Sequence, residues 1–236
     1  MNIKIKKIIE SALVIIIILY VGAITYPYIL FKHSIKYKNI EVYSTKPIDS
    51  SIIKVLSSSF LKLDKTTIDD TTKIHEIFLC NNFTLYSCLA PTSRKAFGCN
   101  YIYLNSIFIA KCNVNKNESY KNDNTDNYVR NLDEVIAHEI SHRLLLNKFG
   151  VWKNKWIENW KNEGFCETIG YGQIFNLIEA KNFITKNKNN NGHRVYYKKC
   201  FYAVSYLMTE RKMTLNEIIS SKITLEDTLK LIQTSK

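Results

Sequence analysis

Two histidines and a glutamate in the segment 131–150, NLDEVIAHEISHRLLLNKFG, have the spacing of a metal site. The apolar residues of this segment recur at helical spacing, which predicts one amphipathic helix. Four residues advance an α-helix by about 400°, so His138 and His142 lie one turn apart on the same face. The two imidazoles can therefore bind one metal ion. Glu139 lies about 100° around the helix from His138 and can face a water molecule at the metal, where a general base acts.

A carboxylate further along the chain completes a ligand set. Glu163 lies 21 residues beyond His142, in the segment WKNEGFCETIG, which predicts a second helix. Two histidines and one glutamate leave a fourth position open, as catalytic zinc sites do. The sequence therefore predicts Zn²⁺ bound by His138, His142 and Glu163. Glu158 is the alternative third ligand, but it lies inside a turn rich in tryptophan.

The segments HEISH and WKNEGFCE together resemble the zinc-binding motifs of the gluzincin metallopeptidases. The N-E-G-F element is most similar to the aminopeptidase and leukotriene-hydrolase branch, and thermolysin is a more distant relative. The resemblance implies an α+β, zincin-like fold, in which a small mixed sheet precedes the metal-binding helix, the glutamate helix and C-terminal helices. It also implies that His138, His142 and Glu163 bind zinc and that Glu139 is the catalytic base.

A third segment, VYYKKCFYAVSYL at 195–207, is similar to the Y-x-K-G element of the same branch. By this resemblance Tyr197 stabilises the oxyanion that forms during hydrolysis. His193 and Tyr196 are alternatives for this role, but Tyr197 alone aligns with the motif. Cys200 stands in place of the glycine of the motif, so the local backbone departs from the family pattern.

Two further expectations concern the surroundings of the metal. Glu167 lies one helical turn after Glu163 and can accept a hydrogen bond from the outward nitrogen of a ligand histidine. Cys166 and Cys200 stand where the related enzymes usually have small residues, on two segments that the resemblance places around the metal. We therefore expect a disulfide between Cys166 and Cys200.

The N-terminal segment 8–31 is apolar, and its stretch 12–24 contains no charged residue. About 20 apolar residues are enough to cross a bilayer. Three lysines precede the segment, and no small-residue cleavage site follows it. We predict an uncleaved signal anchor, with a cleaved signal peptide and a secreted domain as the alternative.

We expect the chain to have three parts: the membrane anchor with its basic flank at 1–33, a juxtamembrane linker at 34–46, and the metallopeptidase domain at 47–236. Lysines lie on both sides of the span, so charge does not fix its orientation. Six cysteines, all after the span, favour an oxidising compartment. We therefore predict a single-pass membrane protein whose domain faces the periplasm or the cell exterior.

The net charge of +12 comes from lysines spread along the chain. No basic block interleaves with aromatic residues as a nucleic-acid platform requires, so we expect no nucleic-acid partner. A basic surface near an anionic membrane or cell wall is the simpler explanation.

The elements that must position the site are a packing helix at 47–63, strands at 73–80, 83–90 and 101–112, and a polar flexible loop at 113–130. The strands are rich in Ile, Tyr and Phe and should form the sheet. By resemblance the last of them is the edge strand beside which an extended substrate binds.

Three tryptophans, Trp152, Trp156 and Trp160, lie four residues apart between the two predicted site helices. This spacing places them on one face of a helical turn, and we expect them to pack against the core. Two short helices should close the chain, because Thr214 and Thr224 are each followed three residues later by an acidic residue that completes a capping box.

The resemblance implies a zinc-dependent peptidase whose substrate is a peptide or protein. The G-x-M-E-N signature, with which the aminopeptidase branch binds a free amino terminus, is absent from the sequence. We therefore expect an endopeptidase. A catalytically inactive zincin-fold binding or scaffold protein at the cell envelope is the alternative, and chelator-sensitive turnover of an unstructured protein distinguishes the two.

Overall fold

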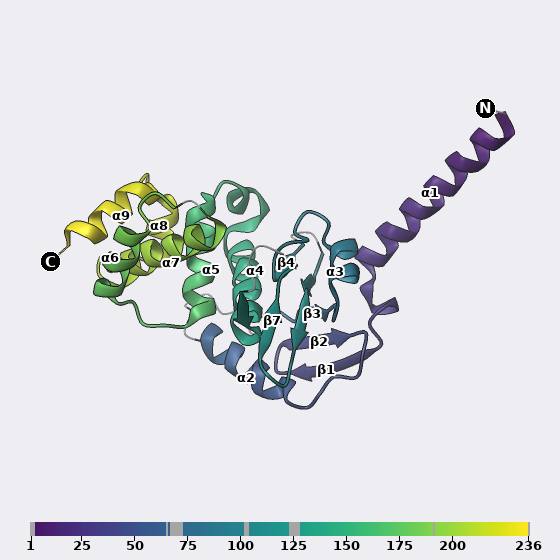
Figure 1. Cartoon of the computed structure of the whole chain (residues 1–236), viewed down its shortest axis with the longest axis horizontal. Helices are drawn as coiled ribbons and strands as arrows, with labels where there is room; N and C mark the ends of the chain where they lie inside the picture. The colour runs from purple at the N-terminus through teal and green to yellow at the C-terminus, as the bar shows by residue number, and fades with distance from the viewer. Residues whose placement is uncertain are drawn as a thin grey trace. The chain divides into compact units, whose positions relative to one another are not determined.

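The chain contains both helices and strands, and the coarse prediction of a mixed α and β protein is confirmed (Figure 1). The computed structural model describes residues 3–64, 66, 73–101, 104–122, 128–190 and 192–235. The chain divides into two units. The first unit comprises residues 1–53 and 72–130, and the second comprises residues 54–71 and 131–236.

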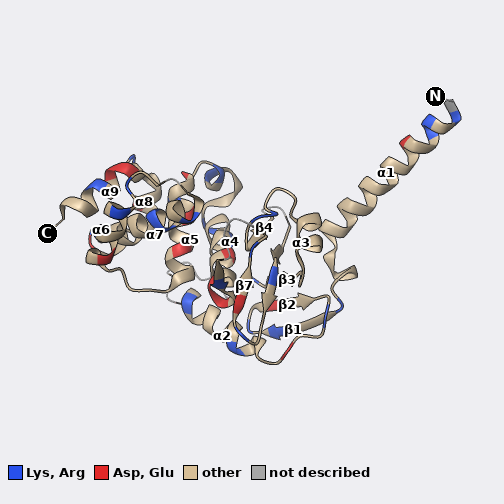
Figure 2. Ribbon diagram, in the orientation of Figure 1, with Lys and Arg blue, Asp and Glu red and all other residues tan. Residues whose placement is uncertain are grey.

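Helix α1 (Ile3–Thr25) begins the first unit and, within the described residues, is the one helix long and apolar enough to cross a membrane. A membrane anchor and a signal sequence both fit this description. Figure 2 shows that the charged residues of α1 lie in its first turns. Near its other end, the Tyr20 hydroxyl donates to the carbonyl oxygen of Cys88 at 2.9 Å, and Ile24 packs against buried residues of the first unit. The C-terminal end of α1 is therefore part of the packing of this unit.

A mixed five-stranded sheet in the order β1-β2-β3-β5-β4 forms the centre of the first unit. The strands are β1 (His33–Tyr37), β2 (Ile40–Ser44), β3 (His75–Leu79), β4 (Gly98–Asn100) and β5 (Ser106–Ile109). The pairs β2/β3 and β3/β5 are parallel, whereas β1/β2 and β4/β5 are antiparallel. In β3 and β5, Ile77 pairs with Ile107 and Phe78 with Phe108, and all four are fully buried. A short 3₁₀ turn, Pro27–Ile29, connects α1 to β1.

The strand predicted at 73–80 is confirmed as β3, but two other expectations for this sheet are wrong. Residues 34–46 are not a bare linker, because four of the five residues of β1 and all of β2 lie within them and join the sheet. The strand within 101–112 is not at the edge, because β5 lies between β3 and β4. The edge on that side is β4, whose three residues pair with β5 alone among the described strands.

Residues 83–90, predicted as a strand, form helix α3 (Phe83–Leu89). The Asn82 side chain caps this helix by accepting a hydrogen bond from the Leu85 amide at 2.8 Å. An Asn cap at the start and Pro91 just beyond the end outweigh the strand preference of the aromatic residues between them. Helix α3 contributes Tyr86 and Leu89 to the core of the unit.

A second sheet lies where a polar loop was expected at 113–130. Its strands are β6 (Lys111–Asn113), β7 (Glu118–Tyr120) and β8 (Val129–Asn131), in that order. Strands β6 and β7 pair antiparallel through a tight turn in which Asn117 has a positive φ of 54°. Asn adopts this conformation more readily than most residues, so an Asn-rich sequence can form a hairpin as well as a loop.

The second unit is helical. Its helices are most of α2 (Ile52–Leu63), α4 (Leu132–Lys155), α5 (Asn159–Tyr171), α6 (Leu177–Lys186), α7 (His193–Thr209), α8 (Leu215–Ser220) and α9 (Leu225–Thr234). Helices α4, α5 and α7 lie side by side in Figure 1. The capping boxes predicted at Thr214 and Thr224 are both formed and begin α8 and α9.

Helix α4 is the predicted metal-binding helix. The apolar stripe expected to pack it on the core is buried: Val135, Ile136, Ile140, Leu144 and Leu145. Its first turn is fixed by Asp133, which accepts a hydrogen bond from Ser58 Oγ at 2.6 Å and lies 3.0 Å from Lys62 Nζ. Lys62 also donates to the Gly170 carbonyl oxygen at the end of α5, at 3.1 Å. An acid at one helix start and a lysine at another helix end both complement the helix dipoles.

The tryptophan prediction is only partly right. Trp160, in the first turn of α5, is 5% exposed, but Trp152 and Trp156 are 80% and 81% exposed. Gly150, with a φ of 72°, breaks the helical geometry of α4. The short helical stretch that follows this break does not continue the buried stripe of α4, so two of the three indoles face outward.

Gly164 permits an unusually close approach of α5 and α7. A Cβ at this position would lie 2.5 Å from the Cys200 carbonyl oxygen and 2.5 Å from a methyl carbon of Val204. One of these neighbours is backbone of α7, which cannot rotate away. The glycine after Glu163 therefore sets the spacing between the two helices.

We predict that Gly164→Ala lowers the free energy of unfolding by about 2 kcal/mol. Overpacking against backbone costs about 3 kcal/mol, and the better helix propensity of alanine returns about 1 kcal/mol. Gly192→Ala is the matched control, because its Cβ would meet only the movable Asn190 side chain. Urea unfolding of the full-length protein in detergent measures both, and an equal stability of the two variants would contradict the close contact.

Candidate metal centre

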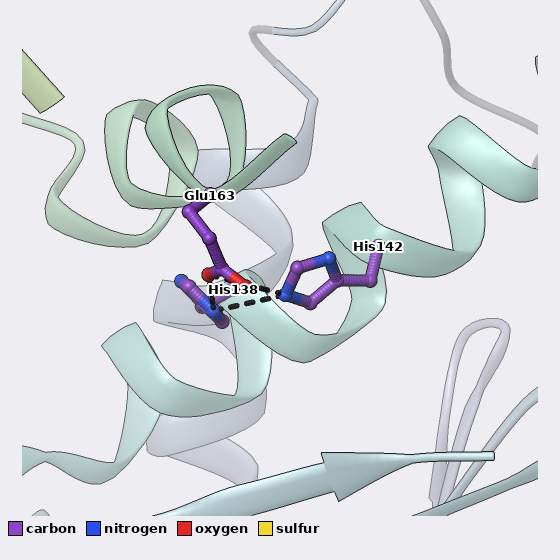
Figure 3. Close-up of side chains that lie close together, drawn as sticks. All are labelled: His138, His142 and Glu163. Carbon is purple, nitrogen blue, oxygen red and sulfur yellow. Dashed lines mark hydrogen bonds and ion pairs between the residues drawn. The ribbon is translucent and has the colours of Figure 1, made fainter. Parts of the chain in front are cut away.

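Three side chains converge in the second unit as the sequence predicts (Figure 3). The Nε2 atoms of His138 and His142 lie 3.1 Å apart. Glu163 Oε2 lies 3.5 Å from His138 Nε2 and 3.6 Å from His142 Nε2. Two residues come from α4 and the third from α5, the neighbouring helix. This group could hold a metal ion.

The three separations suit a tetrahedral metal. Zinc bonds to nitrogen and oxygen are about 2.0–2.1 Å long, so two ligand atoms at tetrahedral angles lie about 3.3–3.4 Å apart. The observed separations of 3.1, 3.5 and 3.6 Å lie on both sides of this value. The ligand atoms therefore need to move only by tenths of an ångström to bind one ion.

Each ligand histidine has an oxygen atom at its other ring nitrogen. Glu167 Oε1 lies 3.2 Å from His138 Nδ1, and Asn162 Oδ1 lies 2.7 Å from His142 Nδ1. Oxygen acceptors at Nδ1 favour the tautomer with its proton there, which leaves the Nε2 lone pairs free for a metal. Glu167 thus lies where the sequence analysis expected it.

Asn162 was missed. It precedes Glu163 on α5, and the signal that could have found it is the second ligand histidine, which also needs an oxygen partner for its outward nitrogen. From the sequence, only Glu167 is predicted as such a partner. One turn of α5 therefore supplies one residue of the candidate metal group and a partner for a histidine of the same group.

Glu163 gives a direct test of whether a cation fits. Its Oε2 atom is buried and accepts no hydrogen bond from the described residues. Burial opposes ionisation, but the neighbouring His142 and His138 outweigh it and lower the pKa of the Glu163 carboxyl. With both histidines neutral and protonated at Nδ1, this oxygen would face two nitrogen lone pairs and no donor hydrogen. Such a cluster is costly to bury alone, and a divalent cation would satisfy all three atoms.

The packing of α4 on α5 produces this geometry. His138 and His142 lie one turn apart on α4, and Glu163 and Glu167 lie one turn apart on α5. Residues four apart share a face of a helix, so the polar pair of one helix meets the polar pair of the other. Of the three ligand side chains, His142 is the most exposed at 22%, so the group is most accessible from its side.

Glu139 and Tyr197 lie near the ligands. The Tyr197 ring centroid is 6.5 Å from that of His138, with the rings 29° from parallel. Burial raises the pKa of Tyr197 above its ordinary value, and the negative charges of Glu163, Glu167 and Glu139 raise it further. All three carboxylates therefore act on the same phenol, which keeps its proton and can serve as a hydrogen-bond donor.

The two alternatives to Tyr197 are placed differently. The Tyr196 hydroxyl accepts a hydrogen bond from Asn159 Nδ2 at 3.3 Å, at the start of α5. His193 is exposed, and its ring centroid lies 4.5 Å from that of Tyr197. Of the three aromatic residues, Tyr197 is thus the one whose ring lies over a ligand histidine.

The expected disulfide between Cys166 and Cys200 is not formed. None of the six cysteines, each of which lies in the described part of the chain, forms a disulfide. The Cys166 sulfur points to α4 and lies 3.3 Å from His142 Nδ1, whereas the Cys200 carbonyl oxygen faces Gly164. Burial raises the pKa of the Cys200 thiol to about 12, so this sulfur stays protonated.

We predict that the purified full-length protein binds about one divalent metal ion and that His142→Ala loses it, because two remaining ligands cannot hold a tetrahedral site closed. His193→Ala is the control, since this exposed histidine lies outside the ligand group. Elemental analysis after dialysis measures the metal content. Full metal content in His142→Ala would contradict the assignment.

Comparison with known proteins adds no assignment to this geometry. No protein-family model matches the chain, and a search of curated proteins finds no match.

Proposed function

We propose that the chain is a membrane-anchored zinc-dependent peptidase of the gluzincin type. The observation that carries the proposal is the convergence of His138, His142 and Glu163, with a hydrogen-bond acceptor at the outer nitrogen of each histidine. Two imidazoles and one carboxylate, with a further position open, are the donor set of catalytic zinc sites.

A zinc ion bound by these residues would supply Lewis acidity toward a water molecule and a scissile carbonyl group. Glu139 follows His138 directly, is 8% exposed, and its charge acts on the Tyr197 phenol. In the proposed mechanism Glu139 accepts a proton from the attacking water and passes it to the leaving amine nitrogen. Water and the peptide bond are consumed, and a carboxylate and an amine are formed.

Tyr197 acts on the oxygen that becomes negative. Its phenol remains protonated because burial and three nearby carboxylates raise its pKa. A protonated donor that is already held in place costs no reorganisation when the charge develops. We assign Tyr197 the oxyanion role on this basis.

The described fold is consistent with the zincin-like expectation in element order. A mixed sheet precedes a helix with both histidines, and a helix with the glutamate follows. The mixed sheet before the two helices is the part of this order that the site motifs do not themselves fix, and it agrees with the resemblance.

We assign α1 as the anchor because its C-terminal end packs within the first unit through Tyr20 and Ile24. Removal of a signal peptide would remove these contacts. We propose a peptide or protein chain as the substrate and internal peptide bonds as the preferred sites of cleavage. A periplasmic or extracellular location rests on the cysteine content alone, because none of the six cysteines forms a disulfide.

We predict that Glu139→Gln retains the metal and loses about 10²- to 10⁴-fold in the rate of peptide hydrolysis, the usual contribution of a general base. Glu226→Gln, at an exposed position of α9, is the control for the loss of one carboxylate. Cleavage of an unfolded protein by full-length enzyme, with and without a chelator, measures the rate. Activity that survives in Glu139→Gln would remove this residue from the mechanism, and metal without chelator-sensitive turnover in the unmodified protein would favour an inactive scaffold.

We predict that Tyr197→Phe lowers kcat by about 10²- to 10³-fold with little change in KM, because the donor acts only when the oxyanion forms. Since the raised pKa keeps the phenol protonated, the unmodified enzyme should lose no activity near pH 10 through this group. Tyr196→Phe is the matched variant on the next residue. A large loss in Tyr196→Phe and none in Tyr197→Phe would reverse the assignment.

A further inference from the structure

The segment 148–156, which we term the tryptophan turn, exposes large aromatic surface on a short helical stretch. Trp152 and Trp156 are 80% and 81% exposed, and Val151 beside them is 38% exposed. Residues four apart lie on one face of a helix, so the two indoles project from the same side. Singly exposed apolar residues are ordinary, but two indoles on one face are a feature that needs a partner.

The tryptophan turn is also basic. Lys148, Lys153 and Lys155 lie within it, and the sequence contains no acidic residue from Ile140 to Ile157. The amines of Lys148 and Lys153 lie 5.8 and 5.1 Å from the centroid of the Phe149 ring. The nine residues of the tryptophan turn thus include three lysines and two exposed tryptophans and no acidic residue.

The next acidic residue does not offset this charge. Glu158 lies just beyond the turn, and its carboxylate is 2.6 Å from Lys161 Nζ and accepts a hydrogen bond from Trp160 Nε1 at 3.0 Å. This ion pair belongs to the start of α5, where Lys161 is buried. Because Glu158 is paired with Lys161, its carboxylate does not neutralise the lysines of the tryptophan turn.

Buried residues hold the turn at both ends. Leu144 and Leu145 precede it in the stripe of α4, and Ile157 and Trp160 follow it with 9% and 5% exposure. Gly150 has a positive φ that a side chain would strain. The indoles are thus presented on a fixed frame and not on a loose loop.

We propose that the tryptophan turn inserts into the interface of an anionic membrane and holds the second unit against the lipid surface. Tryptophan is enriched at membrane interfaces, where its ring lies in the apolar layer and its N–H reaches the wet layer. Lysine beside it binds anionic head groups. Protein interfaces are the weaker fit, because lysine is depleted in them.

A bilayer is also a partner to which α1 would tether the chain. Helix α1 is apolar enough to cross a bilayer, and a chain anchored there meets lipid at a high effective concentration. The inference rests on the proposed anchoring by α1, and it does not rest on the proposed peptidase activity.

Full-length protein in vesicles tests the proposal. We would reconstitute it in phosphatidylcholine with or without phosphatidylglycerol and compare ordinary lipids with lipids brominated near the head-group end of the acyl chains. Bromine quenches indoles that enter the bilayer. The chain has three tryptophans, and Trp160 is buried, so it serves as the internal reference.

We expect brominated lipid to quench the emission of the unmodified protein, more strongly with phosphatidylglycerol and less strongly at high salt. In Trp152→Phe/Trp156→Phe, the remaining emission of Trp160 should be unquenched. Lys153→Gln/Lys155→Gln should reduce the quenching of the two outer indoles without changing the metal content, which reports that the second unit is folded.

Three outcomes would overturn the proposal. Equal quenching in the unmodified protein and in the double tryptophan variant would show that the outer indoles do not enter lipid. Protection from aqueous acrylamide without quenching by brominated lipid would assign the turn to a second copy of the chain or another protein. If the protein does not float with vesicles at all, α1 is not a membrane anchor and this inference is wrong. The tests of metal binding and peptidase activity do not depend on that result.

Discussion

The contact between α4 and α5 brings together three buried or partly buried groups that can each offer a lone pair to a cation. Two imidazole nitrogens and one carboxylate oxygen meet within 3.6 Å. Burial of such a group costs several kcal/mol unless a cation satisfies it. The apolar stripe of α4, the ion pair of Lys62 with Asp133 and the close contact at Gly164 hold the helices in this arrangement. A bound metal would therefore stabilise the helix packing as well as complete the site, because metal binding and folding are coupled.

The sequence predicts the parts of the site that depend on one helical period. His138 and His142 share a face for this reason, and Glu163 with Glu167 do so on the next helix. The apolar stripe of α4 follows from the same periodicity. The contact between α4 and α5 is a long-range feature that helical periodicity does not predict. It was predicted from the order and spacing of the two sequence motifs.

Other features depend on directions that spacing does not give. Residues 83–90 suit a strand or a helix by composition, and the single side-chain bond of Asn82 to the Leu85 amide decides in favour of the helix. Cys166 points toward His142, away from the disulfide expected with Cys200. The tryptophan spacing predicted one buried face. Because the helix is broken at Gly150, the side chains of Trp152 and Trp156 are exposed instead.

Helix α1 contacts the rest of the first unit directly, without an intervening flexible linker. Tyr20 lies inside the apolar helix, yet its hydroxyl already touches the carbonyl oxygen of Cys88 in α3. If α1 crosses a bilayer, this hydrogen bond would keep α3 close to the end of the membrane-spanning helix. A first unit held in this way would meet mainly molecules that diffuse along the membrane or emerge from it, and fewer of those dissolved farther away.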